Sequence, residues 1–529
     1  MRKTLLLFLA LTGAAVQGAW GQTELTLYDS GENAADNSTT ISSKSNDGNT
    51  YNVTLNGRTL YKDGDWNTLC LPFAMTASQV AASPLAGATI MELGTASLDN
   101  SGLLTLNFST ANAIEAGKPY VMKWPVALTI KSKADWDTFV ENVALGETDG
   151  DTYAGKTVKL AADISIGSAV LGNKNTPFMG TFDGGGHTIT CDITDTNDEG
   201  VAPFFYIKDA TIMNVKVAGS VTGGNHCAGL VGFADGTNTI QNCWVAANVT
   251  RSTGSHCAGV LGHAQKSTTT ISNCLYSGTI TGGAAAVGII CGWSDTDATT
   301  TITNCLANGT YTTTTGTADT TTTGTADMIQ GSGTKTVTGC YQNIASEGKQ
   351  GTYIGTISAS DLVSSLGTNW QEADSKAVPV MNSNITNPQF SGVTIDKNER
   401  GYDTDNVSVT TDARVRFLGT YVPQSFSEEN KSILFLGAEN TLYYPLSGAS
   451  IGACRAYFKI GDDTASARQV TSFSLNFGDE YSTLGVTTPL SPARGAGGEA
   501  WYSLDGRRLS QKPSRAGVYI NNGVKVVIK

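Results

Sequence analysis

Three consecutive stretches of similar sequence in the middle of the chain decide its fold. Residues 226–250 read HCAGLVGFADGTNTIQNCWVAANVT, residues 256–281 read HCAGVLGHAQKSTTTISNCLYSGTIT, and residues 285–312 read AAVGIICGWSDTDATTTITNCLANGTYT. The Asn-Cys pair recurs every 31 residues, and His-Cys-Ala-Gly recurs after 30. Short apolar runs alternate with Gly, Asn, Asp and Thr, and the period of a helix is absent. Each stretch is therefore predicted to form strands and turns.

A repeat of this length predicts that each unit stacks on the next, because one unit cannot bury its apolar face alone. The expected fold is all-β, with a right-handed parallel β-helix at its centre. Equivalent positions of successive coils then lie about 4.8 Å apart, so like side chains form columns. We expect one column of asparagines and a neighbouring column of cysteines: Asn242, Asn273 and Asn304, then Cys243, Cys274 and Cys305.

The ten cysteines of the chain allow more than one interpretation. Stacked cysteines fall within disulfide reach, but their parallel side-by-side orientation fits the required dihedral angle poorly. Cysteine also fills an interior row as a small hydrophobic residue. We expect free buried thiols, with disulfides as the first alternative and a bound metal as the second.

The repeats carry a short glycine motif in register. It reads Gly-Leu-Val-Gly at residues 229–232, Gly-Val-Leu-Gly at 259–262 and Gly-Ile-Ile-Cys at 288–291. These residues resemble the GLUG repeats of bacterial surface and adhesin-like proteins. Upstream, residues 178–189 (FMGTFDGGGHTI) resemble the turn-rich first coil that precedes such repeats. The resemblance implies a scaffold exposed outside the cell, and it names no ligand.

Both ends of such a stack need covers, because open strand edges and an open core are liabilities. Ser132 to Asp135 form a start resembling a capping box, and Trp136, Phe139, Val140 and Val143 follow at helical spacing. This pattern predicts an amphipathic helix over the first end. Residues 361–366 and Trp370 predict a short helix and an aromatic plug at the other end. The β-helix is therefore expected to span residues 128–384, with helical caps.

The segments on either side of the repeats resemble each other in character. After an N-terminal segment at 22–50, residues 51–127 and 385–479 are both aromatic-rich and strand-like, without helical periodicity. They resemble the two parts of one β-sandwich-like module common in secreted Bacteroidetes proteins. The β-helix is then inserted between the parts, since insertion is tolerated at exposed loops. Two separate small sandwiches are the alternative.

The two ends of the chain predict export. Residues 1–21 have the form of a secretory signal peptide, with Arg2 and Lys3 before the apolar run Leu5 to Leu11. That run is too short to span a bilayer, so no transmembrane span is expected. A linker at 480–500 precedes residues 501–529, which form a small β tail resembling the C-terminal sorting signals of the type IX route. A terminal β-hairpin is the alternative for this tail.

Charge limits the partners. The chain has a formal net charge of −12 and no basic patch, which excludes a nucleic-acid-binding protein. Export places it in the medium or on the cell surface, associated with the outer membrane. The expected partners are host or dietary glycans, or surface proteins.

Catalysis on this scaffold requires ionisable groups that converge on one groove, as in polysaccharide lyases and glycosidases. The repeats offer few candidates: Asp235, Lys266 and Asp295 near equivalent turn positions, and Arg251 beyond the first repeat. Asp183 belongs to the Gly-rich turn upstream, where aspartate is ordinary turn chemistry. We expect His226 and His256 to stack, and His187 and His263 to be isolated. Metal-ligand spacing is absent. No catalytic, cofactor-binding or metal-binding residue is therefore expected, and a carbohydrate-active enzyme is the alternative function.

A non-catalytic binding module is the function that the repeats favour. Trp244, Tyr276 and Trp293 are possible aromatic platforms for a sugar or a partner surface. The alternative is that these rings pack beneath loops or inside the coils.

Overall fold

The structure is a computed structural model, and its chain divides into two compact units: residues 1–124 with 384–529, and residues 125–383. It describes the following residues: 23–196, 200–252, 256–282, 287–313, 326–343, 350–397, 415–427, 430–437, 440–461, 470, 472–477, 481–482, 501–503, 508–509, 517–521 and 524–528. The expected signal peptide lies outside these residues. The described chain is mostly strand, so the all-β prediction is confirmed. None of its helices is long and apolar enough to cross a membrane.

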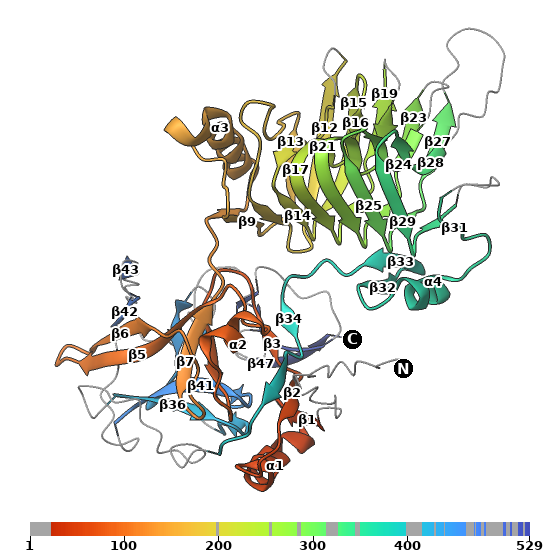
Figure 1. Cartoon of the computed structure of the whole chain (residues 1–529). Helices are drawn as coiled ribbons and strands as arrows, with labels where there is room; N and C mark the ends of the chain where they lie inside the picture. The colour runs from red at the N-terminus through yellow and green to blue at the C-terminus, as the bar shows by residue number, and fades with distance from the viewer. Residues whose placement is uncertain are drawn as a thin grey trace, which may run out of the picture. The chain divides into compact units, whose positions relative to one another are not determined.

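Residues 125–383 contain two large sheets of parallel strands (Figure 1). Strands from successive repeats pair in parallel through the first sheet: β9 (Thr157–Leu160), β11 (Thr181–Asp183), β14 (Thr211–Met213), β17 (Val231–Gln241), β21 (Leu261–Ser272), β25 (Thr299–Thr303) and β29 (Thr334–Thr338). We call these strands the parallel stack.

The second sheet follows the same rule. Its parallel strands are β12 (Thr188–Asp195), β15 (Lys216–Gly223), β18 (Trp244–Val245), β19 (Asn248–Arg251), β22 (Leu275–Tyr276), β23 (Thr279–Gly282), β26 (Leu306–Ala307), β27 (Thr310–Thr313) and β30 (Tyr341–Gln342). The register matches the sequence repeat, since Ile240 pairs with Ile271 and Ile271 with Ile302. The three isoleucines are fully buried in one core cluster. Residues one repeat apart are therefore spatial neighbours.

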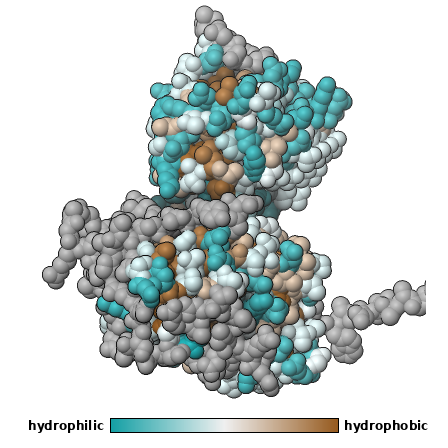
Figure 2. Space-filling view, turned by 90° about the vertical axis from the view of Figure 1, so that its left-hand side faces the viewer, coloured by the Kyte–Doolittle hydropathy of each residue, from teal (hydrophilic) through white to brown (hydrophobic). Residues whose placement is uncertain are grey.

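Helix α3 (Lys133–Asp149) lies at one end of the parallel strands (Figure 1). Its N-cap Ser132 accepts a hydrogen bond from the backbone N–H of Asp135, as the capping pattern predicted. Trp136, Phe139 and Val143 are fully buried in the same core cluster as the strands. The sequence pattern therefore predicted this helix and its buried side correctly. Figure 2 shows this side of the unit, where hydrophobic residues are visible among hydrophilic ones.

The second predicted cap packs differently from the expectation. Helix α4 (Ala359–Leu366) is followed by the antiparallel pair β32 (Trp370–Ala373) and β33 (Lys376–Pro379). Leu362, Leu366 and Trp370 share a small core cluster with Leu275 and Leu306 of β22 and β26. Tyr276, next to Leu275, belongs instead to the main core. Because neighbouring residues of a strand face opposite sides, α4 covers the outer side of the second sheet rather than its end.

The segments flanking the repeats form the other unit together. Strand β6 (Leu103–Thr110) pairs in parallel with β42 (Ser472–Asn476), and β2 (Tyr51–Asn56) pairs antiparallel with β35 (Gln389–Val393). One core cluster contains Phe108, Phe417 and Phe458. The ring of Phe108 meets each of the other two rings edge to face. Residues far apart in the sequence thus share one core.

The end of the chain adds a small antiparallel sheet. It contains β44 (Trp501–Ser503), β45 (Arg508–Leu509), β46 (Gly517–Asn521) and β47 (Val524–Ile528). The antiparallel pairing of β46 with β47 is what a terminal hairpin requires. Use of the tail as a sorting signal stays a prediction.

Candidate binding surface

One side of the parallel stack presents uncharged hydroxyl groups in a regular array. The strand positions that point away from the core pair across β17, β21, β25 and β29. We call this array the hydroxyl face; its residues are Thr237, Thr239, Gln241, Thr268, Thr270, Ser272, Thr299, Thr301, Thr303, Thr334, Thr336 and Thr338. All of them are exposed or half-buried, and all except Gln241 carry a hydroxyl.

The central column of this face continues beyond the three similar repeats. Thr239 pairs with Thr211, Thr211 with Thr181, and Thr181 with Thr157. Neighbouring parallel strands lie about 4.8 Å apart, so the threonine hydroxyls recur at that spacing along the column. The same contact is thereby offered on strand after strand.

Strand alternation explains why these residues face outward. The intervening positions Ile240, Ile271 and Ile302 are fully buried in the main core. The other intervening positions include the buried polar residues Thr269 and Thr300. Thr269 donates to Ser267 over 3.1 Å, and the hydroxyls of Thr300 and Ser294 lie 3.0 Å apart. Hydrogen bonds that satisfy buried hydroxyls in this way help to keep the underside of the face rigid.

The predicted asparagine column occupies a turn at the edge of the hydroxyl face. Asn242, Asn273 and Asn304 have φ angles of 54°, 52° and 51°, in the left-handed region that asparagine tolerates better than most residues. Each backbone N–H donates to a carbonyl one repeat on, over 3.0 Å. The side-chain amide of Asn242 also donates to the Oδ1 of Asn214 over 3.3 Å. These residues turn the chain and tie successive repeats together.

The predicted cysteine column lies directly inside that turn. Cys243, Cys274 and Cys305 are fully buried in the main core. The backbone N–H of Cys274 lies 3.4 Å from the Sγ of Cys305 in the next repeat. Burial raises the pKa of all three thiols. All ten cysteines are free and buried, so this column acts as packing.

The three predicted ligand-contact aromatics have different surroundings. Trp244 is half-buried, with the Lys216 Nζ 3.9 Å from its ring centroid and its Nε1 donating to the Ser277 Oγ over 2.7 Å. Trp293 is also half-buried, and its Nε1 donates to the Asp295 Oδ1 over 3.0 Å. Tyr276 is fully buried, and its hydroxyl donates to the Ala247 carbonyl over 3.3 Å. Tyr276 therefore packs in the core, which corrects its assignment as a contact residue.

A histidine cluster occupies the outer side of the same repeats. His226 and His256 stack with centroids 5.2 Å apart and planes inclined by 7°, which confirms the prediction for this pair. The prediction that His263 is isolated is wrong. Its ring stacks on His226 at 4.1 Å, and its Nε2 lies 3.1 Å from the Asp295 Oδ1.

Strand pairing places two further aromatic residues, Phe233 and Trp293, beside His263. Tyr206 pairs with Phe233, Phe233 with His263, and His263 with Trp293. The ring centroids of Tyr206 and Phe233, and those of Phe233 and His263, are 5.5 Å apart. Phe233, His263 and Trp293 lie 30 residues apart in the sequence. That spacing was a usable signal for an aromatic column, and comparing only identical residues between repeats missed it.

Burial favours the neutral forms of His226 and His256. Burial, followed by repulsion from His263 and His256, lowers the pKa of His226 from the ordinary value of 6.5 to about 3. Burial also lowers the pKa of His256, with repulsion from Arg251 as the next cause. Uncharged rings can stack closely, whereas protonated rings at these distances repel one another.

The candidate catalytic acids make structural contacts. Asp183 is buried, lies 3.5 Å from the Lys159 Nζ, and accepts hydrogen bonds from Asn214 and from the backbone of Gly185, each over 3.0 Å. Asp235 accepts from the backbone N–H of Gly236 over 2.9 Å. Contacts of this kind are ordinary turn chemistry. Within the described ranges, no group of three or more His, Cys, Asp or Glu side chains is arranged to hold a metal ion.

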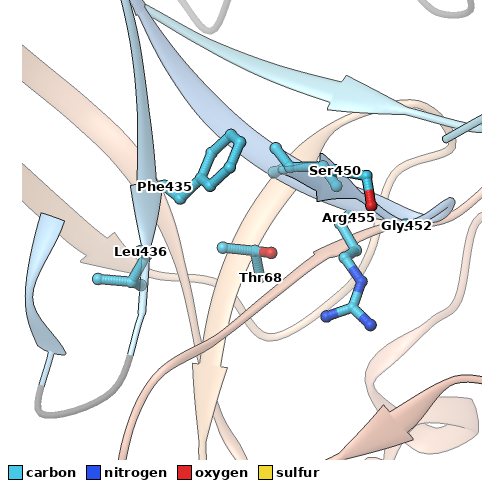
Figure 3. Close-up of a pocket in the computed structure, with 8 residues that line it drawn as sticks. Thr68, Phe435, Leu436, Ser450, Gly452 and Arg455 are labelled. Atoms are coloured by element: carbon cyan, nitrogen blue, oxygen red, sulfur yellow. The ribbon is translucent and has the colours of Figure 1, made fainter. Parts of the chain in front are cut away.

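A small open pocket lies in the other unit (Figure 3). Its empty volume is about 320 Å³, and it is lined by Thr68, Phe435, Leu436, Ser450, Ile451, Gly452, Arg455 and Ala456. The guanidinium of Arg455 is paired with the Asp29 carboxylate at 3.0 Å. That pairing neutralises the charged group of the lining, so the pocket offers weaker recognition chemistry than the hydroxyl face.

Comparisons with known proteins give no indication of function, so a functional proposal rests on the observations above. No family model, no curated protein and no solved structure matches the chain.

Proposed function

We propose that the chain is an exported, non-catalytic protein of the cell surface or the extracellular medium, acting as an adhesin-like binding scaffold for glycans or surface proteins. In this proposal residues 125–383 form a right-handed parallel β-helix, inserted into a β-sandwich-like module built from the two flanking segments. The GLUG-like motif at residues 229–232 and its copies support a surface role.

One observation carries the proposal: the outward positions of successive repeats bear the same uncharged hydroxyl groups in register. Such a surface makes one weak contact many times, and repeated weak contacts add up to useful avidity. Catalysis instead needs a few ionisable groups converging on one point. Asp183 and Asp235, two of the three acids considered for that role, accept hydrogen bonds from backbone N–H groups of turns, and the third, Asp295, lies beside His263 and Trp293. A binding scaffold therefore has more support than a lyase or glycosidase.

The test uses the full mature chain on an array of glycans and on intact mucus or cells, beside a screen for polysaccharide degradation. We expect retention on at least one surface without release of reducing or unsaturated sugars. Variants Asp183→Asn and Asp295→Asn provide the control for hidden catalysis. Sugar release that either substitution abolishes would replace the scaffold with an enzyme.

A further inference from the structure

The hydroxyl face has the chemistry to select one class of ligand. We propose that it binds an extended, uncharged polysaccharide chain lying along its columns, across β17, β21, β25 and β29. This inference rests on the proposed binding function and adds to it both the site and the ligand class.

The first argument is geometric. Hydroxyl groups recur about 4.8 Å apart from strand to strand, and about 6.6 Å apart between alternate residues of one parallel strand. Thr268, Thr299 and Thr334 are exposed, and they form one outer column. Thr270, Thr301 and Thr336 form the column beside it. A linear polymer that repeats a polar group at each unit can contact such a column many times, whereas a compact ligand cannot.

The second argument is the absence of charge on the hydroxyl face. Nucleic acids and anionic polysaccharides are held by Lys and Arg, and the face contains neither. The net charge of −12 adds repulsion toward any polyanion. A neutral polymer meets no such penalty.

The third argument concerns proteins as occupants. Protein interfaces gain most of their binding energy from Trp, Tyr and Arg anchors, and the hydroxyl face has none of these. Each threonine hydroxyl offers one donor and two acceptor lone pairs, which complement the hydroxyls of a sugar. Its methyl group can contact the apolar C–H surface of a pyranose ring. A neutral sugar chain therefore suits this face better than a protein.

The magnitude of single contacts predicts a dependence on chain length. A neutral hydrogen bond contributes only about 0.5–1.5 kcal/mol net. A short oligosaccharide that spans one or two strands is then bound weakly. A long chain that spans β17 to β29 gains from each further strand, so affinity rises with length.

The chain offers a matched pair of variants for the test. The face variant carries Thr239→Val, Thr270→Val and Thr301→Val, which removes three stacked hydroxyls with little change in side-chain volume. The control variant carries Thr222→Val, Thr250→Val and Thr281→Val, a column stacked in the same way in the second sheet. Valine favours strands as threonine does, so both variants are expected to fold. Circular dichroism and thermal melting check this.

The experiment measures binding of the full mature chain to soluble neutral polysaccharides, a β-glucan, a xyloglucan and a mannan, with polygalacturonate as the anionic probe. We expect binding to at least one neutral polymer and weaker binding to its short oligosaccharides. The face variant should lose at least about tenfold in affinity, the smallest effect expected from removing three weak hydrogen bonds. The control variant should keep the parental affinity.

Several outcomes would overturn the inference. Equal affinity of the face variant and the parent protein would show that the hydroxyl face is not the binding site. Preference for polygalacturonate, or binding only to a protein, would show that the ligand is not a neutral polysaccharide. The proposed scaffold function would still be supported. Association between copies of the chain that the face variant abolishes, seen by analytical ultracentrifugation, would assign the face to self-assembly. Absence of binding to every glycan and every surface would defeat the scaffold proposal as well.

Discussion

The imidazole rings of His226 and His263 stack with their centroids 4.1 Å apart and their planes inclined by 26°. The two residues belong to successive repeats but to different positions within them. His256 stacks on the other side of His226 at 5.2 Å, and Trp293 lies 4.2 Å from His256. The charged groups that act on this cluster include Arg251 and Asp295. Because burial lowers the pKa of His226 and of His256, we expect the fold to be sensitive to acid.

The stability of the chain should fall in mild acid because of this stack. His226 has a pKa of about 3 in the folded state, below its ordinary 6.5. Between these values the unfolded chain binds more protons, so the free energy of unfolding decreases as the pH drops below about 6.5. We expect His226→Gln to flatten the dependence of the melting temperature on pH between about pH 7 and pH 4. His187→Gln, at a more exposed position outside the stack, is the matched control for replacing a histidine.

The left-handed turn after each hydroxyl strand should tolerate glycine and reject alanine. Asn273 has a φ of 52°, and Gly339 occupies the equivalent place before Cys340 with a φ of 63°. In this conformation alanine loses roughly 1–2 kcal/mol through its Cβ, a cost that asparagine offsets with the local hydrogen bonds of its short side chain and that glycine avoids. We expect Asn273→Ala to lower the free energy of unfolding by about that amount, and Asn273→Gly to cost clearly less. Urea unfolding measures both, and equal costs would contradict the strain argument.

The cysteines should all be titratable as thiols, and they should differ in reactivity. Ten free thiols are expected in denaturant without reductant. In the native chain, burial raises the pKa of Cys243 and Cys274, whereas the hydrogen bond from Cys305 lowers the pKa of Cys340. Because the thiolate is the reactive form, we expect iodoacetamide to label Cys340 first. Peptide mass spectrometry reads the order. Fewer than ten thiols would reveal disulfides, and earlier labelling of Cys243 would contradict the burial argument.

The helix that covers the end of the parallel strands should be needed for stability. Trp136 is fully buried, and its ring meets Phe139, Phe182 and Phe204 edge to face. Trp136→Ala should lower the free energy of unfolding by about 3–5 kcal/mol. Loss of the N-cap in Ser132→Ala should cost about 1 kcal/mol. The exposed Leu145 provides the control, since Leu145→Ala removes no buried contact. Equal effects of Trp136→Ala and Leu145→Ala on urea unfolding would show that α3 is not a structural cover.

The sequence by itself determined the features that repeat or act locally. The 31-residue spacing of Asn242, Asn273 and Asn304 predicted that they stack in one column, because stacked repeats place like residues at like positions. The structure adds that all three occupy the same left-handed turn. The capping pattern at Ser132 predicted helix α3, because an N-cap bond joins residues three apart in the chain. Charge and hydrophobic alternation predicted an all-β chain with outward polar residues.

Only the tertiary structure decided the contacts between unlike residues. The sequence offered Tyr276 and Trp293 alike as possible aromatic platforms, but the pleat turns Tyr276 into the core and leaves Trp293 half-buried. The stack of His226 on His263 joins two positions that no repeat equates. Pairing of β6 with β42 brings together strands from both flanks. Such contacts depend on where the chain returns in space, and that is set by the packing of the whole core rather than by any local pattern.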